Sequence, residues 1–292
     1  MLLDGTADPL SVVSSSDQQY AAIGLKDGLI YPYQFDDVDG IVALPQLQDL
    51  TEAISSMYLC GSILFVGTVG GVVAIFDLDM QSINNSCLGR HSMGNSPIRA
   101  VASTQDGDHY AVSTQFECRI YNRSKGSSSW HMARDEQTTE YAATCACWFE
   151  GGSLGVAVAI GGGNGGTSVL LRSVGGSVFL SEDTGCEVLA MSSLNHRDML
   201  VVSHGDCPRS YCSWDAGSEM KRSIVAYTIH IGDGCLTPTY KMRGHSSCPI
   251  NLTTKRDEIV TAASGDDDTI RFWTLPSPHT TVFASLQFDE LR

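Results

Sequence analysis

The chain has 292 residues, of which 42% are hydrophobic and 17% charged, and its formal net charge is −15. This size and composition allow a large core within one domain, residues 1–292, and exclude a disordered chain, while the negative charge opposes direct binding of nucleic acid or anionic membranes. No apolar run reaches the roughly 18 residues of a membrane span and no export signal opens the sequence, so we expect a cytoplasmic or nuclear protein whose ten cysteines are reduced thiols.

Six similar units follow one another along the chain, at roughly the 40 to 45 residues of one propeller blade. Each unit runs from an apolar β segment through a polar turn to a strand of small residues, then turns at Gly or Asp into an aliphatic and aromatic strand. No long helical period interrupts the units, so we predict an all-β propeller of four-stranded blades, with about six blades and seven as the alternative. The units are Leu10–Leu47, Thr51–Leu88, Ile98–Arg134, Tyr141–Asp183, Glu187–Met242 and Pro249–Phe288.

Closure of the ring is the least supported part of this prediction. A blade alone cannot bury its faces, so each blade must stack on its neighbours. Only about ten residues precede the first unit, which leaves little chain to supply a strand to the last blade. The tail Thr280–Phe288 is instead expected to form the fourth strand of the last blade. We therefore predict a ring without an evident latch.

The last unit carries a distinctive set of polar residues. Gly244-His245 precedes its first strand, Asp267 occupies the turn between its second and third strands, and Trp273 ends the third strand. A buried imidazole that bridges the carboxylate, with the indole N–H bonded to an acceptor, would fix the loops between strands. This set resembles a WD repeat. The resemblance implies a eukaryotic propeller scaffold in which His245, Asp267 and Trp273 form a structural network.

The other units keep only parts of this pattern. In the first unit, Asp27 and Tyr33 retain the spacing between the turn acid and the strand aromatic. The hydroxyl that the family places on the second strand is expected at Ala263 or Gly265 of the last unit, where neither residue has one. The resemblance therefore covers most of the chain, and we expect an incomplete network even in the last unit.

Two patterns with a possible chemical role favour turns instead. Gly161, Gly163 and Gly166 match the spacing of a dinucleotide-binding loop, but residues typical of a strand follow where that loop needs a helix. Asp266-Asp267-Asp268 lacks the alternating ligands and distal Glu of a calcium-binding loop. We predict a hairpin turn at the glycines and a strand-joining turn at the acidic residues.

Neither a metal site nor a catalytic set emerges from the remaining residues. Cys207, Cys212, Cys235 and Cys248 lack the two closely spaced pairs of a structural zinc site. The sequence also has no nucleophile elbow, zinc-protease motif or phosphate-binding loop. We therefore predict a non-enzymatic protein with no cofactor, no metal and no small-molecule substrate.

One segment between strands is much longer than its counterparts. Ser203–Arg222 in the fifth unit exceeds what joining two strands needs. The resemblance to a WD repeat implies that a loop at this position opens on the same face as the Gly-His loop. Its residues include kinds that are common at binding hot spots. Packing of Trp214 over the blade is an alternative that can hold at the same time. The candidate partner-binding residues are Asp206, Pro208, Arg209, Tyr211, Trp214, Lys221 and Arg222.

These features favour a scaffold or adaptor subunit that binds other proteins of a multiprotein complex. In a narrower form of this hypothesis, a partner strand completes an open ring by edge pairing, as in nuclear-pore or coat-like assemblies. An alternative is an acidic propeller that reads a short basic peptide, such as a histone-like tail. A propeller hydrolase is a remote alternative, because the fold alone does not decide function.

Overall fold

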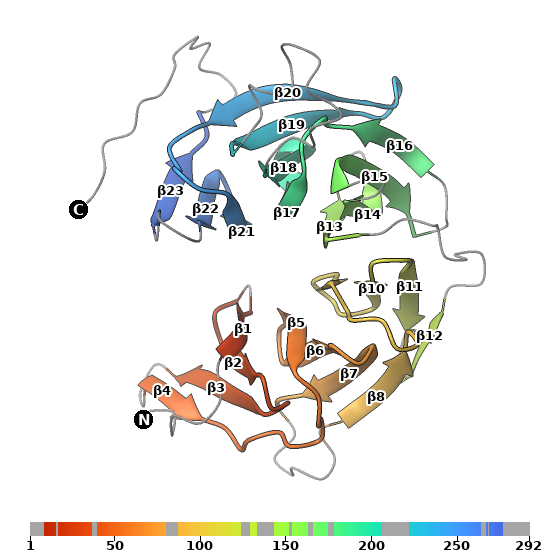
Figure 1. The fold of residues 1–292 in the computed structure, drawn as a ribbon, viewed down its shortest axis with the longest axis vertical. Coiled ribbons are helices and arrows are strands. Elements are labelled where there is room, and N and C mark those ends of the chain that lie inside the picture. The colour runs from red at the N-terminus through yellow and green to blue at the C-terminus, as the bar shows by residue number, and fades with distance from the viewer. Residues whose placement is uncertain are drawn as a thin grey trace.

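The chain folds into six antiparallel β-sheets arranged as the blades of a propeller (Figure 1). This confirms the predicted fold class and the prediction of about six blades. Among the described residues, no helix is both long and apolar enough to cross a membrane. The computed structural model describes residues 9–15, 17–36, 40–79, 87–123, 129–132, 143–151, 154–162, 166–174, 178–205, 222–263, 267 and 269–276.

Each blade is a meander in which every strand pairs with the next strand along the chain. The first three blades are β1 (Pro9–Ser14), β2 (Tyr20–Leu25), β3 (Ile30–Asp36) and β4 (Gly40–Ala43); β5 (Ile54–Cys60), β6 (Ile63–Thr68), β7 (Val72–Asp77) and β8 (Cys87–Ser92); and β9 (Ala100–Ser103), β10 (His109–Ser113), β11 (Cys118–Arg123) and β12 (Trp130–Met132). The last three are β13 (Cys145–Gly151), β14 (Gly155–Gly161), β15 (Ser168–Ser173) and β16 (Val178–Asp183); β17 (Val188–Leu194), β18 (Met199–His204), β19 (Ile224–His230) and β20 (Cys235–Met242); and β21 (Pro249–Lys255), β22 (Glu258–Ala263) and β23 (Ile270–Thr274).

The last blade has three strands among the described residues, and the other five blades have four. The segment Thr280–Phe288, which we expected to be the fourth strand of the last blade, lies outside the described residues. A 3-10 turn, η2 (Asn195–Arg197), joins β17 to β18.

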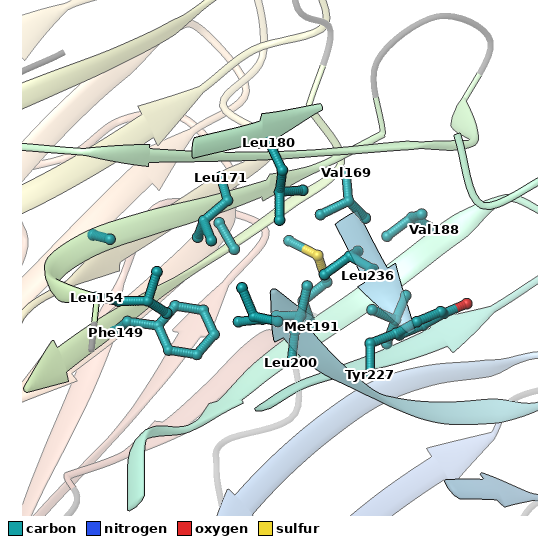
Figure 2. Close-up of a cluster of buried hydrophobic side chains, with 14 of the residues drawn as sticks. Phe149, Leu154, Val169, Leu171, Leu180, Val188, Met191, Leu200, Tyr227 and Leu236 are labelled. Carbon is teal, nitrogen blue, oxygen red and sulfur yellow. The ribbon is translucent and has the colours of Figure 1, made fainter. Parts of the chain in front are cut away.

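The hydrophobic core lies between the blades. Five buried clusters in the described part of the chain fill the five junctions between consecutive blades. Figure 2 shows the junction of the fourth and fifth blades, where Phe149 and Leu171 of one sheet pack with Leu200 and Tyr227 of the next. Each blade is therefore stabilised mainly by its neighbours, as expected for stacked repeats.

Three of the five junctions share one packing feature. At each of them a glycine near the end of a second strand receives a branched aliphatic side chain from the next blade. A Cβ on such a glycine would overlap that side chain, so the absence of a side chain allows the blades to approach closely. The pairs are Gly24 with Ile54, Gly67 with Ile98 and Gly161 with Val188, and a Cβ on these glycines would lie 2.7, 2.4 and 2.6 Å from the nearest aliphatic carbon.

One of the eight described cysteines differs from the prediction. Cys186, which is completely buried just before β17, is disulfide-bonded rather than a reduced thiol. The other seven described cysteines are thiols, as predicted, and none of them is its partner. Cys207 and Cys212 of the long segment lie outside the described residues.

Candidate interaction site

The polar network predicted in the last blade is present and complete. Nδ1 of His245 lies 3.1 Å from Oδ2 of Asp267, and Nε2 lies 2.7 Å from Oγ1 of Thr261. The indole Nε1–H of Trp273 donates to the same Thr261 oxygen at 2.9 Å. A carboxylate can only accept, so Nδ1 carries the imidazole proton and Nε2 accepts from the Thr261 hydroxyl. One chain of hydrogen bonds therefore runs from the indole to the carboxylate.

The strand hydroxyl corrects the sequence prediction. The hydroxyl was expected at Ala263 or Gly265, and Thr261 supplies it instead. Thr261 and Ala263 are two residues apart on β22 and therefore share one face of the sheet. The hydroxyl therefore lies two residues before the expected Ala263, on the same face of the strand. Gly265 lies outside the described residues.

The charges in this network are fixed near neutral pH. Burial opposes ionisation of Asp267, but hydrogen bonds from Thr269 and from the backbone N–H groups of Ser246 and Ser247 outweigh it and lower its pKa to about 2. Burial also lowers the pKa of His245, against the attraction of the Asp267 carboxylate. The ionised Asp267 carboxylate can therefore accept the hydrogen bonds of the network near neutral pH.

The first blade keeps only part of the pattern. Asp27 accepts a hydrogen bond from the backbone N–H of Leu29 at 3.1 Å, within its own turn. Tyr33 lies on β3 opposite Ala21, on the half-buried face of the sheet. The two residues keep the predicted spacing without forming the chain of bonds seen in the last blade.

The long segment of the fifth blade is described only at its ends. Of its candidate partner-binding residues, Arg222 is described, and Asp206, Pro208, Arg209, Tyr211, Trp214 and Lys221 lie outside the described residues. The Arg222 guanidinium donates to the carbonyl of Ser246 at 3.3 Å. Because Ser246 follows His245, this bond places the end of the long segment beside the Gly-His loop, as the sequence predicted.

The structure describes part of the two turn-like patterns. β14 and β15 form an antiparallel hairpin, so a strand follows Gly166 where a dinucleotide-binding loop would need a helix. Within the described ranges, no three His, Cys, Asp or Glu side chains are grouped so that they could hold a metal ion. Gly163, Asp266 and Asp268 lie outside the described residues.

The last blade exposes an apolar face that is buried in every other blade. Ile270 begins β23 and pairs with the small residue Ala262 near the end of β22. Ile270 is 66% exposed, and Phe272, two residues further along the same face, is 72% exposed. In the other five blades the residue in the register of Ile270 is at most 3% exposed. These residues are Ile30, Val73, Cys118, Val169 and Ile224.

The first blade exposes the face that, in later blades, packs on the preceding blade. Val12 lies on β1 next to the residue that pairs with Gly24, and it is 68% exposed. On three of the five later blades the residues in the same register, Met57, Met191 and Leu252, are 6% to 8% exposed because they pack on the preceding blade. Nothing in the described part of the chain covers Val12 in this way.

The two exposed faces border the same opening. Consecutive blades pack through their first strands from β1 to β21. In Figure 1 the ring is open on the side where the last blade (blue) stands opposite the first blade (red). Six blades therefore leave one blade junction unformed among the described residues, and its two apolar halves face solvent.

Comparisons with known proteins extend these observations at the level of the fold. No protein-family model matches the chain. No curated protein matches its sequence. A chain of the crystal structure of the mitotic checkpoint complex is similar to it, with a TM-score of 0.74 and 18% identity over 94% of this chain and 80% of that chain. A putative 6-phosphogluconolactonase from Bacteroides uniformis is also similar, with a TM-score of 0.68 and 11% identity over 91% and 80% of the two chains.

These likenesses show a propeller fold that occurs both in a protein complex and in a putative enzyme. Identities of 18% and 11% are too low to transfer an activity. The WD-repeat resemblance therefore depends on the network of the last blade and on the fold.

Proposed function

We propose that this chain is a non-enzymatic scaffold or adaptor subunit of a multiprotein complex. The observation that carries the proposal is the pair of uncovered blade faces beside the opening. Side chains such as Val12, Ile270 and Phe272 occupy positions that are core in the other blades, yet they are 66% to 72% exposed. Contiguous exposed apolar patches of this kind mark surfaces that another molecule covers.

A hydrolase is the second candidate, because the similar putative lactonase has the same fold. The polar residues of the last blade give little support to this candidate. Burial lowers the pKa of His245, and hydrogen bonds lower the pKa of Asp267 to about 2. Reading of a basic peptide remains an alternative form of protein binding, and the net charge of −15 is consistent with it.

Native purification tests the proposal. Chain tagged at its normal expression level should elute from cell extract well above its own 31.3 kDa and carry at least one stoichiometric protein partner. Elution as a monomer without a partner, together with hydrolysis of sugar-phosphate lactones by the purified chain, would contradict the scaffold proposal and support the hydrolase. Association that is lost between low and high salt would favour the basic-peptide alternative.

A further inference from the structure

We infer that the opening between β21–β23 and β1–β4 binds a β-sheet of at least three strands from a partner polypeptide, which completes the ring as a seventh blade. This inference rests on the proposed scaffold function and specifies its partner. The exposed face of the last blade is the one that, in the other blades, packs against the following blade. The exposed face of the first blade is the one that, in the later blades, packs against the preceding blade. One additional blade between them would cover both faces.

A second copy of the chain does not fit the same opening. A blade that fills the opening needs two free faces. No described blade of a second copy has two, because the first blade packs on the second and the last blade packs on the fifth. The occupant therefore comes from a different protein.

A sheet covers the exposed surface better than a single strand. The blades form separate sheets and contact each other through side chains rather than through ladder hydrogen bonds. On the first blade the uncovered apolar residues extend from Val12 on β1 to Ile41 on β4, across the full width of the sheet. One strand covers a strip only about 4.8 Å wide. Pairing of a lone strand to an edge, as the sequence led us to consider, would leave most of this face in water.

The junctions also specify the chemistry of the partner. Ala262 pairs with Ile270 on the last blade as Gly67 pairs with Val73 on the second blade. Gly67 receives a branched aliphatic side chain from the next blade, but Ala262 has a Cβ that would overlap such a side chain, so we expect the first strand of the partner sheet to place a small residue against Ala262. Its second strand should carry a small residue opposite Val12. Neither face should carry a charge at these positions, because it would be buried without a counter-ion.

Site-specific photo-crosslinking in native cells tests this assignment. A photoreactive phenylalanine at position 12 and another at position 272 should each crosslink to the same partner polypeptide, within strands of one sheet. The control positions are Phe116 and Val178, which are 62% and 55% exposed but lie on the third and fourth blades, and they should not reach that sheet. Crosslinks from position 12 to the last blade, to a second copy, or to a different protein from that reached by position 272 would overturn the inference.

Charge substitutions provide the second measurement. Val12→Lys and Phe272→Lys should each lower recovery of the crosslinked partner at least tenfold, whereas Phe116→Lys should not. All three positions are exposed, so the thermal unfolding of the purified variants should match that of the parent chain. If both opening variants retain every stoichiometric partner, the seventh-blade inference fails and the scaffold function stands. If the parent chain has no partner at all, both fail.

Discussion

Removing one hydroxyl group tests the network of the last blade. In the variant Thr261→Val a methyl group replaces the hydroxyl at nearly constant volume. The indole N–H of Trp273 and Nε2 of His245 then lose the partner that they share at 2.9 and 2.7 Å. Each buried polar group left without a partner costs about 1–3 kcal/mol, so the free energy of unfolding should fall by about 2–6 kcal/mol.

Urea unfolding followed by circular dichroism measures this loss, and hydrogen exchange of the β21–β23 amides locates it in the last blade. The matched control is Thr253→Val on β21, where the side chain is exposed, and it should change stability by less than about 0.5 kcal/mol. Trp273→Phe combined with Thr261→Val should cost less than the sum of the two single changes, because both remove the same bond. If Thr261→Val is as stable as the Thr253→Val control, the network does not stabilise the blade.

Three further predictions concern the other blades. Burial lowers the pKa of His204 from 6.5 to about 4, so as the pH drops the unfolded state binds a proton at this residue before the folded state does. The free energy of unfolding should therefore fall by about 2–3 kcal/mol between pH 7.5 and 4.5. Urea unfolding of His204→Gln at both pH values should show that this part of the pH dependence is removed. Gly67→Ala should cost about 1–3 kcal/mol in urea unfolding because the added Cβ would lie 2.4 Å from Ile98, and a stability equal to that of the parent chain would contradict the packing rule. Trp148→Phe removes an indole N–H that donates to the carbonyl of Ala102 on the third blade at 2.9 Å. The free energy of unfolding in urea should fall by about 1–3 kcal/mol. An unchanged stability would mean that water replaces this bond.

Much of the fold could be predicted from the sequence because each blade repeats the same local pattern. Turn residues, small-residue strands and the set of His245, Asp267 and Trp273 indicated the blades and their order. The position of Thr261 was missed because two threonine or alanine positions on one strand face are equivalent in a pattern of period two. Only the length and direction of the Trp273 side chain distinguish them.

The sequence predicted a ring without an evident latch, but it did not indicate which residues such a ring exposes. Ile270 and Phe272 are aliphatic and aromatic residues at the start of a third strand, just like their counterparts in the buried junctions. Their exposure depends on whether another blade follows, which is a property of the ring and not of the local sequence. Cys186 was misjudged for a similar reason, since its pairing depends on which thiols the fold brings together.

The position of the hydrogen-bond network has a consequence for recognition. In a linear array the terminal unit frays first, because it has a neighbour on one side only. Here that unit holds its loops with the Trp273–Thr261–His245–Asp267 relay, which does not need a second neighbour. Under the proposed function, bonds within the last blade would therefore hold its strands in place before a partner binds, and less conformational entropy would be lost on association.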